Sequence, residues 1–544
     1  MSGGHSIIGA ENRLAIIGAG PAGCLVASAL VDAAAIRGVS LSISLYGAGT
    51  TSRGDEVFLA DDAALAHLAA AGLPSPALMD RPLKRLRFQA GAAALDSHTR
   101  WFSLVRDEVV GGLRACAAAR GVRLVQRRVE ELAQTVDGGW VLRAHGASER
   151  ADRIILACGA GASIAGRHGG HLSPPLWRGC VASLEIDEEL AARLDGTLVR
   201  IRAGGAHPEL SVVSHGRLAS VYAHGVDVGP KELGLALLAA TSLGALPGRF
   251  RLRGIRRIHA PGGVARPGLP TVGAALGGIP ACSLLALAGS QAQRLAAACF
   301  GDDLLHVSIR EARALEGALE RRRRLQRSLR RFGDAALEAA VRDRHPEDAP
   351  LPRLIAEAAG PGLREAGPMG EGRTTIGARV AVFFRLLFAF LAFAWHRLLE
   401  TSARRRAPTP PPPRRRMVYV VEDDPECADL LGAALDQRRI PYRRFANGIE
   451  AAAMAPLDRP AAIVLDVVLP WIDGAQLSHE LKAGSDVSIL LTTSLPRTSL
   501  LGRRSASADQ ILTKPLDPEL VAARLARFLP PPDPGGPAPG PRSG

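Results

Sequence analysis

The stretch "MVYVVEDDPE" (residues 417–426) places three acidic residues directly after an apolar run. The apolar run predicts a buried strand, and Glu422, Asp423 and Asp424 follow its end. Carboxylates repel one another, so crowding them at a strand end costs free energy unless a cation lies among them. The stretch therefore predicts a cation site at the carboxyl end of a β-strand, with further groups of the site expected later in the chain.

A second strand with an acidic end follows in "AAIVLDVVLPWIDG" (461–474), where the apolar run ends at Asp466. In a parallel α/β sheet the carboxyl ends of the strands form the crevice in which ligands bind. Asp466 is therefore expected beside Glu422 and Asp423. Mg²⁺ takes oxygen ligands of this kind, and its charge would remove the cost of bringing the carboxylates together.

Two more strand ends complete the predicted site. "SILLTT" (488–493) ends in hydroxyl groups, and "QILTKP" (510–515) ends in Lys514 followed by a proline. Lys514 is one of four lysines in a chain of 544 residues. A metal, a carboxylate, a hydroxyl and an ammonium group around one crevice suit a transferred phosphoryl group.

With these motifs in this order, residues 417–530 resemble the receiver domain of two-component response regulators. The resemblance implies a flavodoxin-like (βα)5 fold, phosphorylation of Asp466 by a histidine kinase or a phosphotransfer protein, and contacts from Thr492 and Lys514 to the phosphoryl group. The implied ligands of Mg²⁺ are Glu422, Asp423, Asp466 and the Val468 carbonyl. One position departs from the family pattern, since Ile511 stands where an aromatic switch residue is usual. A receiver that is never phosphorylated and serves only for docking stays open as the alternative.

The N-terminal region begins with "RLAIIGAGPAGCLVASAL" (13–30), which reads as a strand, a GxGxxG loop and a helix. Gly18 permits a tight turn, Gly20 lets a pyrophosphate approach the backbone, and Gly23 lets the helix pack closely on the strand. The helix N-terminus adds a positive field for an anion. The region is predicted to bind a dinucleotide in a Rossmann-like fold.

Further motifs in this region are "RGDEVFLADDAALAHLAAAGL" (53–73), "LVRDEVVGGLRACAAARGVRL" (104–124), "ADRIILACGAGAS" (151–163) and "GLPTVGAALGGIPACSLLALAGSQAQRLAAA" (268–298). Their order resembles FAD-dependent oxidoreductases of the aromatic hydroxylase, geranylgeranyl reductase and tryptophan halogenase type. The resemblance implies an FAD/NAD(P)-binding fold with an inserted substrate subdomain and an isoalloxazine near the loop 273–280, which begins at Gly273. It also implies that Arg106 approaches the cofactor at the mouth of the site. NAD(P)H or a reductase is the implied partner.

Two departures leave the cofactor open. Tyr46 and Gly47 stand where the family has an acid for the adenosine ribose, and Ala274 replaces the Asp of a later "GDA" motif. Each charge-assisted hydrogen bond that is missing costs about 1.5–3 kcal/mol. The region either binds FAD through its backbone or has lost the flavin. The first alternative is an oxidoreductase controlled by the receiver, and the second is a non-catalytic signalling or scaffold protein.

The composition divides the α/β chain into four parts: an oxidoreductase-like domain (1–335), a helical segment with a Pro/Arg-rich linker (336–416), the receiver (417–530) and a Pro/Gly-rich tail (531–544).

The net charge of +14 comes mainly from arginine. The arginine clusters are interpreted as solvated faces and linker, with contacts to acidic lipid or nucleic acid as the alternative. Seven cysteines without a CxxC pair argue against a disulfide framework and a zinc site. No signal peptide is apparent, so a cytoplasmic protein is expected. No helix-turn-helix follows the receiver, so specific DNA binding is not expected.

The run "VAVFFRLLFAFLAFAW" (380–395) is strongly apolar but contains Arg385. It is shorter than the roughly 20 residues that a membrane-spanning helix needs. Three interpretations stay open: a helix packed on the oxidoreductase-like region or on a partner in a homodimer, an interfacial helix at the inner face of the membrane spanning about 380–397, and a true membrane span.

Overall fold

The computed structural model describes residues 12–47, 56–74, 81–90, 93–158, 164, 177–202, 207–224, 228–246, 248–260, 269–270, 284–300, 304–307, 309–310, 415–494 and 507–529. The chain divides into two compact units. The first comprises Met1–Ile201, Leu210–Asp227 and Arg253–Trp395, and the second comprises Arg202–Glu209, Val228–Leu252 and His396–Gly544. The predicted α/β fold class is confirmed for both units. The domain boundaries expected from the sequence stay predictions.

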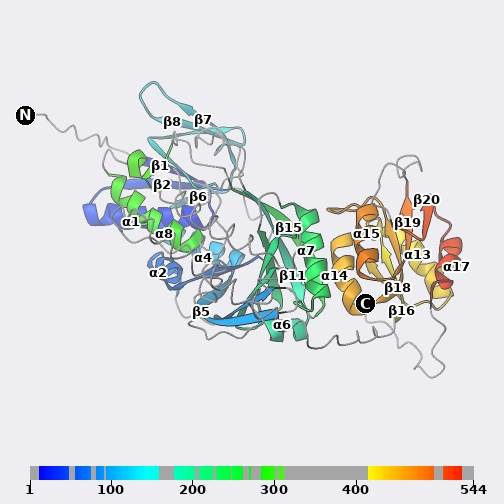
Figure 1. Ribbon diagram of the computed structural model, residues 1–544. Coiled ribbons are helices and arrows are strands. Elements are labelled where there is room, and N and C mark those ends of the chain that lie inside the picture. Colours follow the sequence, from blue (N-terminus) through cyan, green and yellow to red (C-terminus); the bar gives the residue numbers. More distant parts are fainter. Residues whose placement is uncertain are drawn as a thin grey trace, which may run out of the picture. The chain divides into compact units, whose positions relative to one another are not determined.

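A four-stranded parallel sheet lies in the first unit, in the order β10-β1-β2-β6. Its strands are β1 (Asn12–Ile17), β2 (Leu41–Tyr46), β6 (Arg123–Val125) and β10 (Arg153–Leu156). Helix α1 (Pro21–Arg37) contacts α4 (Arg106–Ala119) and α8 (Leu284–Ala298) (Figure 1). Leu14 and Ile16 enter one core cluster, while Ala15 and Ile17 enter another. Because both faces of β1 are buried over residues 14–17, that part of the strand is a continuous apolar run without polar alternation.

Two further sheets lie largely in the first unit, and the smaller of them is antiparallel. The larger has eight strands in the order β15-β11-β14-β13-β12-β4-β5-β3. Its strands are β3 (Val57–Ala60), β4 (Pro82–Ala90), β5 (Ala93–Val105), β11 (Trp177–Ile186), β12 (Thr197–Arg202), β13 (Glu209–His215), β14 (Leu218–His224) and β15 (Phe250–Ala260). The smaller contains β7 (Val129–Gln134), β8 (Trp140–Ala144) and β9 (Ala147–Ala151). The short helices are α2 (Asp62–Ala70) and α6 (Glu188–Leu194), each capped by an aspartate side chain.

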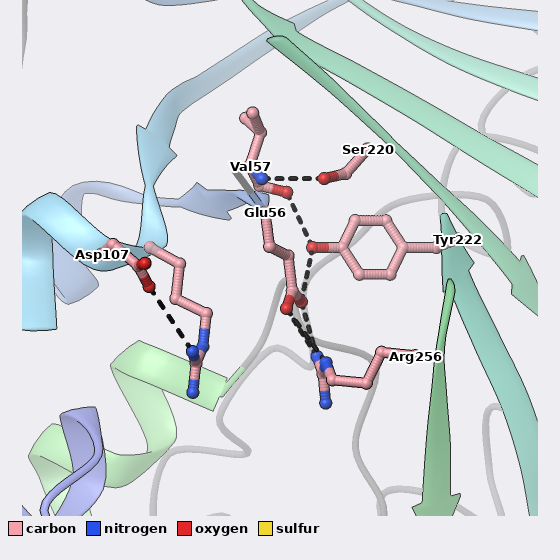
Figure 2. A network of polar contacts seen from close by, with 7 residues as sticks. Glu56, Val57, Asp107, Ser220, Tyr222 and Arg256 are labelled. Carbon is pink, nitrogen blue, oxygen red and sulfur yellow. Dashed lines mark hydrogen bonds and ion pairs between the residues drawn. The ribbon is translucent and has the colours of Figure 1, made fainter. Parts of the chain in front are cut away.

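Side-chain contacts connect the β3 end of the eight-stranded sheet with β15, the outer strand at the other end, and with β14 (Figure 2). Glu56, next to β3, is 4% exposed, and its carboxylate accepts hydrogen bonds from Arg256 on β15 at 2.6 and 2.7 Å. On β14, Tyr222 donates to the Val57 carbonyl at 2.7 Å, and the Ser220 hydroxyl accepts the Val57 N–H at 2.7 Å. At the open edge of β3, the Ser220 and Tyr222 side chains satisfy the backbone N–H and carbonyl of Val57, a role that a neighbouring strand would otherwise fill.

The Arg256→Met variant is expected to lower the free energy of unfolding by about 3–5 kcal/mol, because it leaves the buried Glu56 carboxylate without its ion-pair partner. Urea denaturation followed by circular dichroism measures this. The control is Arg253→Met on the same strand, which removes an ion pair with Glu185 whose side chains are 45% and 35% exposed. That loss is expected to stay below about 1 kcal/mol. Equal losses of unfolding free energy in the two variants would show that the ion pair of Glu56 stabilises the fold no more than an exposed ion pair does.

The second unit contains a five-stranded parallel sheet in the order β17-β16-β18-β19-β20. Its strands are β16 (Arg415–Val421), β17 (Tyr442–Phe445), β18 (Pro460–Asp466), β19 (Ser488–Thr493) and β20 (Gln510–Thr513). Helices α13 (Pro425–Gln437) and α17 (Pro518–Ala526) form a core cluster with Val418 and Val420, while α14 (Gly448–Asp458) contacts α15 (Gly474–Gly484) (Figure 1). This is the doubly wound, flavodoxin-like arrangement expected from the sequence.

Helix α7 (Pro230–Ser242) also belongs to the second unit and contacts α14. The apolar run 380–395 lies outside the described residues. Among the helices that the structure does describe, none combines the length and the apolar character needed to cross a membrane.

Candidate functional site

The carboxyl edge of the five-stranded sheet collects three acidic side chains. Glu422 follows β16 and Asp466 ends β18, two strands that are direct neighbours in the sheet. Together with Asp423, they offer carboxylate oxygens that all lie within 4.8 Å of one another. Glu422 and Asp466 are 3% and 4% exposed, whereas Asp423 is exposed to solvent. The acids predicted from the strand ends are thus brought together by the sheet.

Lys514 is the cation that the structure places among these acids. Its Nζ donates to Glu422 Oε1 at 2.8 Å and to Asp466 Oδ2 at 2.7 Å. Burial alone would lower the pKa of Lys514, but the hydrogen bonds and charges of Asp466 and Glu422 outweigh it and raise that pKa. Three carboxylates and one ammonium leave a formal charge of −3 + 1 = −2, which a divalent cation would balance.

The electrostatics of Glu422 reflect this excess of negative charge. Burial raises the pKa of its carboxyl, the Lys514 hydrogen bond opposes the rise, and the charge of Asp466 adds to it. A buried carboxylate of raised pKa is one whose ionised form is held at a cost in free energy. A cation beside Glu422 would lower that cost.

Two buried polar atoms of the site have no hydrogen-bond partner within the described part of the chain: Glu422 Oε2 and Thr492 Oγ1. Leaving such atoms unsatisfied costs about 1–3 kcal/mol each, and a bound ion or ligand is a usual explanation. Glu422 Oε2 fits a metal ligand, and the Thr492 hydroxyl fits a donor to an anion. The residues present therefore fit Mg²⁺ together with a phosphoryl group.

The loop after Asp466 is shaped by close backbone approach. The Val468 N–H donates to Asp466 Oδ1 at 3.1 Å, and the Val468 side chain is 56% exposed. A Cβ on Gly474 would lie 2.0 Å from the Asp466 carbonyl oxygen, so only glycine fits there. Gly474 was not among the site residues predicted from the sequence, although the "DG" pair at the end of "DVVLPWIDG" indicates a turn followed by a helix start.

Cys427 on α13 offers a reporter for this site. Burial, together with the negative charge of Glu422, raises the pKa of the Cys427 thiol to about 11. Because the thiolate is the reactive form, alkylation of Cys427 is expected to be slow at pH 8 and to accelerate as the pH rises toward 11. Mg²⁺ bound at Glu422 would cancel the charge that disfavours the thiolate, so it is expected to accelerate the reaction.

Iodoacetamide labelling of Cys427, followed by mass spectrometry with and without Mg²⁺, measures this effect. Cys116, a partly exposed cysteine of the first unit, is the internal control. A labelling rate at Cys427 that Mg²⁺ leaves unchanged would argue against a metal ion at Glu422.

In the first unit, the three predicted glycines have different roles in the fold. Gly18 has a φ of 123°, and a Cβ there would lie 2.3 Å from the Ala157 carbonyl oxygen. A Cβ on Gly23 would lie 1.8 Å from the Gly18 carbonyl oxygen. Gly20 is the N-cap of α1, and a Cβ on it would meet no atom of the described residues within 4 Å. The fold itself thus requires Gly18 and Gly23, while the described residues leave space beside Gly20 at the helix N-terminus.

Tyr46, at the end of β2, stands where the family has an acidic residue for the adenosine ribose, and its hydroxyl is engaged in another contact. Its hydroxyl donates to Glu149 Oε2 at 2.7 Å, and Arg123 pairs with the same carboxylate. Burial and the Glu149 contact raise the pKa of Tyr46. A ribose contact in this region would therefore have to come from another group.

Arg106 is the first residue of α4. Its N–H donates to the Glu56 carbonyl at 2.9 Å, and its guanidinium lies 3.7 Å from Asp107 Oδ1. The approach of Arg106 to a flavin, which the family resemblance implies, stays a prediction. Gly273 and Ala274 lie outside the described residues.

Part of the second unit matches a known protein family. Residues 418–526 match the family model described as the response regulator receiver domain. This chain is 34% identical over 112 residues to the response regulator MprA of Mycobacterium ulcerans, covering 20% of this chain and 48% of that protein. This chain is also 30% identical over 114 residues to the DNA-binding dual master transcriptional regulator RpaA of Synechocystis, covering 20% of this chain and 47% of that protein. The chain therefore spans about half the length of the curated relatives it matches.

A solved structure of a geranylgeranyl bacteriochlorophyll reductase-like protein from Thermoplasma acidophilum superposes with a TM-score of 0.50 at 15% identity. It covers 65% of this chain and 98% of that chain. This likeness concerns the fold alone. Residues 418–526 are a response regulator receiver domain, carried in one chain with a region that shares the fold of the reductase-like structure.

Proposed function

We propose that Asp466 accepts a phosphoryl group from a phosphohistidine of a histidine kinase or phosphotransfer protein. The observation that carries this proposal is the convergence of Asp466, Glu422 and Lys514 at one edge of the sheet. An Asp466 carboxylate oxygen forms a bond to phosphorus while the phosphorus–nitrogen bond of the donor breaks, and the donor imidazole leaves with the electron pair. Lys514 supports the charge of the phosphoryl oxygens.

The residues that would hold Mg²⁺ are Glu422, Asp423 and Asp466, with the Val468 carbonyl as a further ligand implied by the family resemblance. Mg²⁺, when bound, neutralises phosphoryl oxygens. The Thr492 hydroxyl, which is buried and has no partner among the described residues, would donate to one of those oxygens.

Titration of the full chain with Mg²⁺ and beryllofluoride, followed by fluorine NMR, tests this function. Binding of beryllofluoride that depends on Mg²⁺ is the expected result, because beryllofluoride mimics a phosphoryl group on a carboxylate. The alternative is a receiver that only docks. Absence of bound fluorine signals at saturating Mg²⁺ would favour that alternative and reject phosphorylation.

For the first unit we propose an FAD-dependent oxidoreductase that receives electrons from NAD(P)H or a reductase. The open space at Gly20, on the N-terminus of α1, supports a dinucleotide there. The alternative is a non-catalytic scaffold. An absorption spectrum of the purified protein distinguishes the two: flavin bands that NAD(P)H or a reductase bleaches support the enzyme, and protein that stays colourless with added FAD supports the scaffold.

We also propose that the phosphorylation state of Asp466 controls the activity or docking of the first unit. Such control requires an element with two arrangements whose balance the phosphoryl group shifts.

A further inference from the structure

Helix α14 is buried on every side. Its buried residues are Gly448, Ile449, Ala451, Ala452, Ala453, Met454, Ala455 and Asp458. A helix that covers one face of a sheet normally keeps a polar outer face, so an apolar surface all round requires a second partner. Within the second unit that partner is α7, whose own buried residues are mostly Ala, Leu and Gly.

The two helices approach closely at one point. A Cβ built on Gly234 of α7 would lie 2.8 Å from Cγ1 of Ile449, which is 0% exposed. The backbone of α7 therefore lies directly against the Ile449 side chain. A larger residue at position 234 would push the helices apart, because packed interiors have little room to adjust.

Buried polar contacts fix this packing at its edges. Arg249 Nη2 lies 2.8 Å from Asp458 Oδ1, and the Asp458 side chain is 2% exposed. Asp458 Oδ2 also accepts from Arg443 at 2.8 Å and from the Tyr419 hydroxyl at 2.7 Å. The Leu252 N–H donates to Glu450 Oε2 at 3.2 Å. Segment 228–252 is thus held by directional contacts as well as by apolar burial.

The first turn of α14 contacts the loop that follows Asp466. A Cβ on Gly448 would lie 2.7 Å from Ile472 Cγ2 and 3.4 Å from Leu469 Cδ1. Gly448 and Ile449 are consecutive, so the phosphoacceptor loop and α7 contact adjacent residues of one helix. Ile511, which replaces the aromatic switch implied by the family resemblance, has no ring or hydroxyl with which to pass on the signal.

We propose that α14 is the output surface of this receiver and that segment 228–252 is its target. This inference rests on the phosphoacceptor function proposed above. A rearrangement of the Asp466 loop that moves Leu469 or Ile472 changes the support of the first turn of α14, and with it the packing against α7. The chain runs from α7 into β15, which begins at Phe250 inside the segment.

Coupling of this kind is reciprocal: if phosphorylation changes the α7–α14 contact, loosening that contact must change the affinity of the Asp466 site by the same factor. The test compares the wild-type chain with Arg249→Gln, Gly234→Val and the control Arg253→Gln. Arg253 pairs with Glu185 on β11. Hydrogen exchange of residues 230–242 measures the contact, and fluorine NMR at saturating Mg²⁺ measures the affinity for beryllofluoride.

Arg249→Gln and Gly234→Val are expected to accelerate exchange in 230–242 and to change beryllofluoride affinity by about fivefold or more. The control is expected to match wild type in both. Faster exchange with unchanged affinity would overturn the coupling, and unchanged exchange in both variants would overturn the α7–α14 contact. If wild type itself binds no beryllofluoride, the phosphoacceptor function fails, and this inference fails with it.

Discussion

The Asp466→Asn variant is expected to take up no phosphoryl group from small-molecule phosphodonors. An amide oxygen is neutral and a poor nucleophile, so no acyl phosphate forms, although the side chain keeps its shape. Radioactive acetyl phosphate, with retained protein-bound label as the readout, measures this in the full chain at saturating Mg²⁺.

The matched control is Asp429→Asn on α13, whose side chain is 70% exposed and pairs with Arg444. This variant loses the same charge from the same domain and is expected to label like wild type. Circular dichroism verifies that both variants are folded. Equal labelling of Asp466→Asn and wild type would assign the phosphorylation to another residue.

The Gly20→Val variant is expected to lose its flavin while keeping its fold. Among the residues that the structure describes, a Cβ at this position meets nothing within 4 Å, so the fold tolerates it apart from about 1 kcal/mol for a poorer helix cap. The two added methyl groups would occupy the space in which a pyrophosphate approaches the backbone. Flavin released by heat and measured by fluorescence gives the bound fraction.

Gly111→Val is the control for this substitution. Gly111 lies within α4, and a Cβ there also meets no described atom within 4 Å. Flavin content equal to wild type is expected in this variant. Full flavin content in Gly20→Val would mean that the glycine loop is not the pyrophosphate site, and flavin-free wild-type protein would favour the scaffold alternative. Gly18 is a poor test, because its φ of 123° makes any side chain a strain on the fold.

The receiver site was accessible from sequence because each of its groups stands at the end of an apolar strand. Glu422 follows β16, Asp466 ends β18, Thr492 lies near the end of β19 and Lys514 follows β20. Parallel strands present their carboxyl ends at one edge, so strand recognition alone places these side chains together. The glycine loop was accessible for a similar reason, since strand, loop and helix are consecutive.

The contacts that join distant segments were not accessible in this way. Glu56 pairs with Arg256, Tyr46 with Glu149, and Arg249 with Asp458, each across a long separation in sequence. No local spacing marks an acid and an arginine as partners when either could equally face solvent. The close approach of Gly234 to Ile449 likewise depends on how two helices pack.

The sequence by itself determined the strands that carry the motifs, the acidic and basic ends of those strands and the dinucleotide-type loop, because these follow from hydrophobic periodicity and from residues close together in the chain. The tertiary structure decided that segment 228–252 belongs to the same unit as the receiver. It also decided that side chains connect the two outer strands of the eight-stranded sheet, and it set the ion-pair partners of the buried acids Glu56 and Asp458. Those outcomes depend on the packing and desolvation of side chains from segments far apart in the chain. No single stretch of sequence contains both partners of such a contact, so no stretch predicts it.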